Sequence, residues 1–162
     1  MSLVNIDLSC FRNVTCIGMD FLADCSSLAS IDLSPLSNIT CINSGFLKDC
    51  TSLTSIDLSP FTNVTVIVAQ FLRGCSSLTA IDLAPLSKVR AIHHMFLSGC
   101  TSLRDVDVTP LASVTRIGVR LLRGTSFVLP DNLDGFSDAM GIALKRAFKE
   151  RAVTRENMES AL

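Results

Sequence analysis

The chain has 162 residues, of which 48% are hydrophobic and 18% are charged, so it can bury a core and is unlike a disordered chain. Its formal net charge of −1 provides no bulk attraction to nucleic acid or to an anionic membrane surface. Trp and Tyr are absent, which weighs against stacking of sugars or bases and leaves Arg, Phe and polar groups for any interface.

The first ten residues lack the basic segment and the continuous apolar run of a signal peptide. No apolar run in the sequence is long enough to cross a bilayer, so we expect no membrane insertion. These features favour a cytoplasmic location for the chain as given. A cell-surface location is the alternative, if the chain is a fragment of a longer array, because its first repeat carries no polar capping unit.

A unit of 25 residues repeats five times in tandem. Each copy opens with Ser-Leu, and the copies begin at Ser2, Ser27, Ser52, Ser77 and Ser102. In the third copy, the alternation around Ile56, Asp57 and Leu58 predicts a strand with the two apolar side chains inward and the carboxylate toward solvent. Pro60 is expected to end this strand, because it has no N–H to donate to a ladder.

A second apolar group in each copy predicts a short second strand and a turn. In the third copy, residues 64–67 are rich in β-branched side chains, and Phe71 and Leu72 follow at the spacing of an irregular or 3₁₀-like turn. One copy has no opposite face on which to bury these side chains. Stacked copies about 4.8 Å apart would bury them in a continuous core. The sequence therefore predicts a parallel solenoid of five rungs over residues 1–130.

The repeat resembles the BspA-type branch of the leucine-rich repeats, which is known from bacteria and protists. The shared features are L-x-x-I-x-L, a turn Pro, V-T-x-I-G and F-L-x-x-C, and residues 2–25 show them most fully. The resemblance covers about residues 2–130. One departure is an apolar position where common leucine-rich repeats hold Asn or Cys, at Phe11, Leu36, Phe61, Leu86 and Leu111. The resemblance implies a leucine-rich-repeat solenoid of the α/β class that binds or adheres through a repetitive surface, without catalysis or cofactor.

One polar position recurs in every copy and is the main candidate for partner binding. The residues are Asp7, Asp32, Asp57, Asp82 and Asp107, with Ser30 and Ser55 beside them. Neighbouring carboxylates about 5 Å apart repel by only about 0.8 kcal/mol in water, so such a column is tolerated. It is either a solvated stripe or a docking stripe for a basic protein partner. A specific metal site is not expected, because hard cations need six or more oxygens and each rung offers one carboxylate.

The charge of the copies changes along the array. The first copy holds three Asp and one Arg, a net −2, whereas the fifth holds four Arg and two Asp, a net +2. Head-to-tail self-association through the uncapped first rung is one interpretation of this gradient. Sequence drift is the other.

Most of the seven Cys recur at the repeat period. Cys25, Cys50, Cys75 and Cys100 form one column, Cys16 and Cys41 form a second, and Cys10 stands alone. This spacing differs from a metal-binding C-x-x-C pair and predicts a buried, reduced thiol ladder. Adjacent members of a column would lie close enough for a disulfide under strong oxidation.

Two other motifs also favour structural roles. Asn13, Asn38 and Asn63 fit the N-glycosylation pattern, but their period favours a turn residue that hydrogen-bonds locally before the second strand. His93 and His94 are adjacent and would point apart on an extended segment. With two His and no recognisable nucleophile–base set, we expect a non-enzymatic protein.

The pattern changes after the fifth copy. Residues 127–130 resemble the strand of an incomplete sixth rung, and residues 136–152 predict a helix capped by Ser137 or Asp134. Its apolar face is expected to comprise Phe136, Met140, Leu144, Ala147 and Phe148. Thr154 is expected to cap a final short helix. Residues 131–162 thus predict a helical C-terminal cap on the core, and a basic amphipathic helix that docks elsewhere is the alternative.

Overall fold

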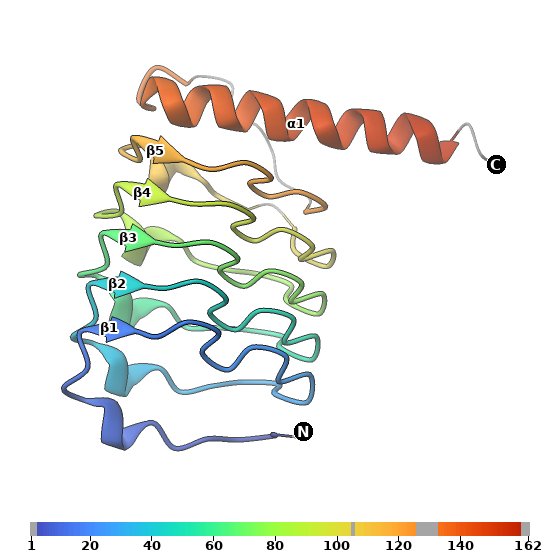
Figure 1. The fold of residues 1–162 in the computed structure, drawn as a ribbon. Helices are drawn as coiled ribbons and strands as arrows, with labels where there is room; N and C mark the ends of the chain where they lie inside the picture. The colour runs from blue at the N-terminus through green and yellow to red at the C-terminus, as the bar shows by residue number, and fades with distance from the viewer. Residues whose placement is uncertain (1–2, 105, 126–132, 160–162) are drawn as a thin grey trace.

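The computed structural model describes residues 3–104, 106–125 and 133–159, with the side chains of the helix described through residue 149. Five similar rungs stack in chain order, and one helix lies across the end of the stack (Figure 1). The strands are β1 (Cys16–Ile17), β2 (Cys41–Ile42), β3 (Val66–Ile67), β4 (Ala91–Ile92) and β5 (Arg116–Ile117). The short 3₁₀ helices are η1 (Ser9–Phe11), η2 (Ser34–Leu36), η3 (Ser59–Phe61), η4 (Ala84–Leu86) and η5 (Thr109–Leu111), and the α-helix is α1 (Asp138–Glu159).

The five strands form one parallel sheet in the order β1 to β5. Each residue pairs with its counterpart in the next copy, as Cys41 does with Val66. The Cα atoms of Cys16 and Cys41 lie 4.9 Å apart, the spacing expected between hydrogen-bonded strands. The 25-residue period therefore sets the register, and the predicted solenoid of parallel rungs is confirmed.

The prediction of a first strand in the repeat is wrong. In the third copy, residues 53–58 form no strand. One backbone hydrogen bond joins this segment to the rung below, in which the N–H of Thr54 donates to the carbonyl of Ala29 at 3.2 Å. A single bond per rung does not make a ladder. Ile56 also departs from the prediction, because it is only partly buried whereas Leu58 is fully buried.

The turn prolines start 3₁₀ helices. Pro60 occupies the first turn of η3, where its missing N–H costs no hydrogen bond. The apolar position that distinguishes these repeats ends each 3₁₀ helix and points into the core. Its members Leu36, Phe61, Leu86 and Leu111 are buried, and Phe11 of the first rung is partly buried.

The irregular turn that was predicted after the second strand is confirmed. In the third copy, Gln70, Leu72 and Gly74 have φ values of 65°, 51° and 75°, and every copy repeats this alternation. The N–H of Leu72 donates backward to the carbonyl of Phe46 at 2.9 Å, and the N–H of Gly74 donates forward to that of Ser98 at 2.8 Å. The turn thus bonds each rung to both of its neighbours.

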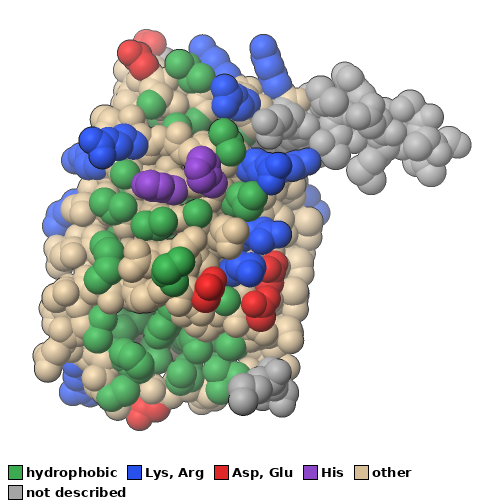
Figure 2. Space-filling view, viewed as in Figure 1, with side chains coloured by type: hydrophobic (Ala, Val, Ile, Leu, Met, Phe, Trp, Pro, Cys, Tyr) green, Lys and Arg blue, Asp and Glu red, His purple; other side chains and the backbone are tan. Residues whose placement is uncertain are grey.

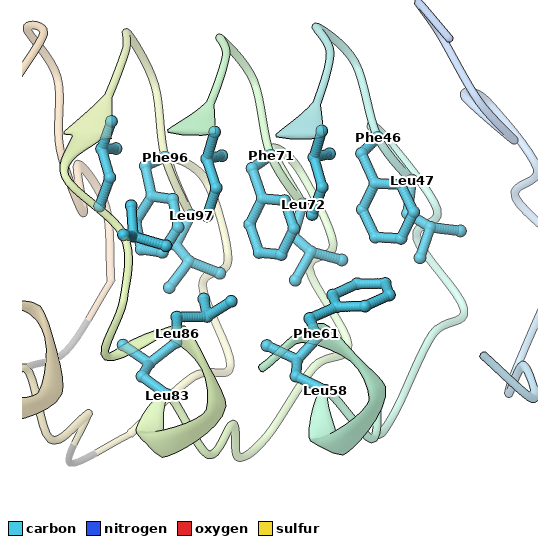
Figure 3. Packing of buried hydrophobic residues seen from close by; sticks show 14 of the residues in the cluster. Phe46, Leu47, Leu58, Phe61, Phe71, Leu72, Leu83, Leu86, Phe96 and Leu97 are labelled. Atoms are coloured by element: carbon cyan, nitrogen blue, oxygen red, sulfur yellow. The ribbon is translucent and has the colours of Figure 1, made fainter. Parts of the chain in front are cut away.

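Phenylalanine side chains stack along the centre of the solenoid (Figure 3). The ring centroids of Phe46 and Phe71 lie 5.4 Å apart, and those of Phe71 and Phe96 lie 5.3 Å apart, with planes within 11° of parallel. Such pairs contribute about 0.5–1.5 kcal/mol beyond the burial of their area. Because each ring contacts only the neighbouring rungs, the stack joins the copies into one core.

The helix α1 covers the end of that core (Figure 1). Met140, Leu144 and Ala147 are buried and belong to the same hydrophobic cluster as the rungs, so the cap is confirmed. The prediction that Phe148 belongs to the same buried face is wrong, because 43% of its surface is exposed. The helix also continues through Thr154, which therefore starts no second helix.

The residue that caps α1 is Ser137, one of the two candidates that the sequence offered. Its Oγ accepts the N–H of Met140 at 3.3 Å and donates to the carbonyl of Val114, and its own N–H donates to the carbonyl of Ala112 at 2.9 Å. The cap residue thus ties the helix to the fifth rung. The predicted sixth rung, residues 127–130, lies outside the described residues. In the described part of the chain, no helix combines the length and the apolar character that crossing a bilayer requires.

Candidate protein-interaction surface

The five Asp side chains of the repeat form an exposed column, which we call the Asp column. Its members are Asp7, Asp32, Asp57, Asp82 and Asp107. In every copy, Oδ1 accepts the backbone N–H two residues later, over distances of 2.8–2.9 Å. This is an Asx turn, which holds the chain as it enters the 3₁₀ helix. The Asp column therefore has a structural role that the strand-based sequence interpretation missed, although D-x-S-P is a turn signal.

Hydroxyl groups complete some of these turns. Ser59 Oγ donates to Asp57 Oδ2 at 2.9 Å, and Thr109 Oγ1 donates to Asp107 Oδ1 at 2.7 Å. In the fourth copy the same position is Ala84, so Asp82 Oδ2 receives no hydrogen bond from the described residues. The acceptor capacity left for a partner thus differs from rung to rung.

Hydrogen bonding stabilises the ionised form of three members of the column, Asp7, Asp32 and Asp107. The backbone N–H of Ser9 lowers the pKa of Asp7, and that of Ser34 lowers the pKa of Asp32. The hydroxyl of Thr109 lowers the pKa of Asp107. The neighbouring carboxylate of Asp32 acts in the opposite direction on the pKa of Asp7, because like charges disfavour ionisation. The column presents negative charge at neutral pH.

The two hydroxyl residues predicted beside the Asp column, Ser30 and Ser55, are exposed. Neither makes a hydrogen bond within the described part of the chain, so both are accessible to a partner. No group of three His, Cys, Asp or Glu residues among the described residues is arranged to hold a metal ion.

The cysteine columns have two different environments. Cys50, Cys75 and Cys100 are buried free thiols, and each Sγ lies 3.0–3.1 Å from the carbonyl of a Leu in the rung below. Burial raises the pKa of Cys50 to about 11 and that of Cys100 to about 12, and it also raises the pKa of Cys75. This part of the predicted thiol ladder is confirmed. Thr125 takes the same position in the fifth copy and donates to the carbonyl of Leu122 at 2.7 Å.

The prediction of reduced, buried thiols is wrong for the second column. Cys16 and Cys41 face outward on β1 and β2 and form a disulfide. The reason is strand parity, because Ile17 and Ile42 point inward and their predecessors must then point out. Cys25 is partly buried, and Cys10 is exposed.

The side chains of Asn38, Asn63 and His94 link neighbouring rungs. Asn38 Nδ2 donates to the carbonyl of Arg12 at 2.9 Å, so its bond reaches the previous copy and is not local as predicted. Asn63 Oδ1 accepts from Lys88 Nζ at 3.2 Å. His93 and His94 are both exposed, and His94 Nδ1 accepts the N–H of Val119 at 3.1 Å.

A groove between β5 and α1 is a feature that the sequence interpretation missed. It has a volume of about 340 Å³, with Val119 and Leu121 on the rung side and Ile142 on the helix side. Arg120 and Arg146, both exposed, also line it. A site of this kind suits a segment that carries an apolar side chain next to a carboxylate. On the face shown in Figure 2, Lys and Arg gather toward α1, and hydrophobic side chains gather on the lower rungs.

Comparison with known proteins identifies the repeat. A family model described as "BspA type Leucine rich repeat region" matches residues 1–129 in six copies. No curated protein matches the sequence significantly. Two solved structures from Listeria monocytogenes are similar in part.

The first is described as the functional domain of InlJ, which includes a cysteine ladder. It is 14% identical with a TM-score of 0.38, and the match covers 80% of this chain and 34% of that one. The second is the internalin InlF of strain 4b F2365, which is 16% identical with a TM-score of 0.26. This match covers 85% of this chain and 56% of that one, so the chain spans about a third to a half of these proteins.

Proposed function

This chain belongs to the family of BspA-type leucine-rich repeat proteins, and on that premise we propose that it is a non-enzymatic protein–protein interaction module. Its binding surface is the Asp column with Ser30 and Ser55, and its partner is a basic protein segment. The observation that carries this proposal is the fixed direction of the five carboxylates, each oriented by its own turn. A rigid row of anions at the rung spacing loses little conformational entropy when a partner binds.

The test uses a fluorescent Lys/Arg-rich peptide as the probe and measures its anisotropy at low and high salt. The test variant carries Asp32→Asn, Asp57→Asn and Asp82→Asn, because Asn keeps the turn acceptor and removes the charge. The control removes three charges elsewhere, through Asp20→Asn, Asp24→Asn and Asp49→Asn. We expect salt-sensitive binding that the test variant loses and the control retains. Equal loss in both variants would refute the Asp column as the site.

A second candidate function is a structural or adhesive element that works in a longer surface array. It is supported by the open edge of the first rung, where the N–H groups of Gly18 and Leu22 donate to no acceptor among the described residues. The parent gene tests this candidate, because further in-frame repeats would be expected upstream. Without further repeats, the chain could build such an array only by head-to-tail self-association through the same edge.

A further inference from the structure

We propose that the groove between β5 and α1 binds an acidic segment of a partner protein, an extended peptide in which an aliphatic side chain stands next to an Asp or a Glu. The inference goes beyond the proposed function, because none of the Asp column residues lines this groove. The two surfaces take ligands of opposite charge, so the two proposals can fail separately.

The groove exposes apolar side chains on both of its walls. Val119, on the rung side, is 47% exposed, and Ile142, on the helix side, is 62% exposed. Met140 and Leu144 form the buried face of α1, so Ile142 is turned away from the core that the helix covers. An aliphatic side chain of a ligand can therefore bury its own surface and that of both walls in the groove.

Each wall also carries one guanidinium group. Arg120 follows Val119 on the rung, and Arg146 lies one helical turn after Ile142 on the same face of α1. Both Arg side chains are exposed, and neither has an ion-pair or hydrogen-bond partner among the described residues. The described residues that line the groove include no Asp or Glu. A carboxylate can therefore bind there without displacing a described partner.

The backbone of the fifth rung has hydrogen-bonding groups in this groove that the described residues leave open. In the four earlier copies, the N–H at the repeat position of Arg120 donates to the next rung, as that of Met95 does to the carbonyl of Val119 at 3.0 Å. The N–H of Arg120 has no such acceptor among the described residues. The carbonyls of Ile117 and Leu121 accept no bond from them either, whereas their counterparts in the earlier copies accept an N–H from the next rung.

These backbone groups favour a peptide over a simple carboxylic acid. A carboxylate can accept from the N–H of Arg120 and from the guanidinium groups, but it has no donor for the carbonyls of Ile117 and Leu121. An extended peptide supplies both N–H and C=O groups beside its side chains, so it can satisfy all of them. The volume of about 340 Å³ lies at the lower end of the usual range for ligand sites, which suits a short segment.

The surroundings of the groove favour an acidic partner at longer range. The fifth copy holds four Arg and two Asp, a net +2, and on the face shown in Figure 2 the Lys and Arg side chains gather toward α1. Such a field speeds the encounter with an acidic segment, and it weakens as salt is added. The contacts in the groove then select an acidic segment that also carries an aliphatic side chain.

The test measures, by fluorescence anisotropy, the binding of a short labelled peptide with Asp-Leu-Glu at its centre and blocked ends. Its two acidic residues place a carboxylate on either side of the aliphatic side chain. Two matched probes each remove one feature, because Asn-Leu-Gln lacks the charges and Asp-Ser-Glu lacks the aliphatic side chain. Hexanoate is the competitor, since it has an aliphatic chain and a carboxylate but no peptide groups.

Variants of the full chain locate the site. Arg146→Gln and Ile142→Gln change the helix wall at exposed positions and keep the helix propensity high. Arg120→Asn changes the rung wall at a φ of 61°, which Asn tolerates. Lys145→Gln on α1 and Arg123→Asn on the fifth rung are the controls, because both residues are exposed, lose the same charge and lie outside the groove lining. Thermal unfolding checks that each variant folds.

We expect the Asp-Leu-Glu probe to bind at low salt and each matched probe to bind at least about fivefold more weakly. Arg146→Gln and Arg120→Asn should each weaken binding about tenfold, the usual effect of losing a charge-assisted hydrogen bond. Ile142→Gln should weaken it about fivefold, because it removes apolar surface from the wall. Both control variants should bind within about twofold of the unaltered chain.

Three results would overturn the proposal: no binding of the Asp-Leu-Glu probe at chain concentrations up to about 1 mM, equal binding of either matched probe, or equal weakening by the control and groove variants. Displacement of the peptide by an equal concentration of hexanoate would also overturn it and would assign the groove to small carboxylates. The Lys/Arg-rich probe of the Asp column should bind Arg146→Gln as it binds the unaltered chain. That probe therefore decides the proposed function separately.

Discussion

Asp57 Oδ1 accepts the backbone N–H of Ser59 at 2.8 Å, while Ser59 Oγ donates to Asp57 Oδ2 at 2.9 Å. This reciprocal pair holds the entry to η3. We expect Asp57→Ala to lower the free energy of unfolding by about 1 kcal/mol, the usual net contribution of such a hydrogen bond. Asp57→Asn keeps an acceptor oxygen and should cost less. Urea denaturation measures both.

The control for this prediction is Ser55→Ala. Ser55 is exposed and makes no hydrogen bond within the described residues, so its loss should change stability by less than about 0.5 kcal/mol. Equal destabilisation by Asp57→Ala and Asp57→Asn would show that the charge, and not the turn, stabilises the fold.

Acid should weaken the first, second and fifth turns. The folded-state pKa values of Asp7, Asp32 and Asp107 lie below the ordinary value of 3.8. Their contribution to stability is therefore complete above about pH 3.8 and is lost as the pH falls through the folded values. As the pH falls below about 4, the midpoint of denaturant unfolding should fall less for a variant with all three residues changed to Asn than for the unaltered chain. An unchanged pH dependence in that variant would contradict the prediction.

Two glycines should respond in opposite ways to alanine. Gly99 has a φ of 82°, and a Cβ there would lie 3.4 Å from the Cα of Gly74. We expect Gly99→Ala to destabilise by about 1 kcal/mol or more, because alanine rarely adopts this conformation. Gly141 lies in α1 with open space around the Cβ position, so Gly141→Ala should stabilise by about 0.5–1 kcal/mol. Melting temperatures that shift in the same direction would contradict the pair.

The free thiols should differ sharply in reactivity. Cys10 is exposed, whereas Cys50 and Cys100 are buried with pKa values raised to about 11 and about 12, so they hold almost no thiolate near neutral pH. We expect a thiol reagent at pH 8 to label Cys10 rapidly and the buried column only in denaturant. Mass spectrometry of the labelled chain, with Cys10→Ser as the control, measures this. Rapid labelling of Cys75 in the folded chain would show that the column opens.

The aromatic stack should tolerate a change in the shape of an apolar side chain better than the loss of that side chain. Phe71→Ala removes a ring that packs between Phe46 and Phe96 and should cost about 3–5 kcal/mol. Phe71→Leu should cost less, because Leu121 fills the same repeat position in the fifth rung and is buried there. Calorimetry of both variants tests this order, and the reverse order would contradict it.

The repeat pattern was sufficient to predict the stack, because a strict period fixes which residues form each column. It was not sufficient to choose the strand. Both Ile56 and Val66 lie in β-prone segments, and the structure places the ladder at Val66. The local composition of the two segments does not distinguish them. The outward direction of Cys16 could have been read from the inward Ile17, since neighbours on a strand alternate.

The candidate surfaces were predictable to different degrees. The exposure of Asp57 followed from alternation, but its turn was a local signal that the strand assignment obscured. The groove could not be predicted, because it depends on how α1 docks on β5. Residues such as Val119 and Ile142 are far apart in the sequence and carry no motif.

Every turn of the second, third and fourth copies bonds forward and backward only to its immediate neighbours, as Leu72 does with Phe46 and Gly74 with Ser98. No described backbone bond depends on how many copies lie beyond the next one. A gene that duplicates or deletes 75 nucleotides within this region would therefore lengthen or shorten the solenoid while leaving each junction unchanged. Length is thus the property of this fold that evolution and protein engineering can alter most freely, in steps of one rung.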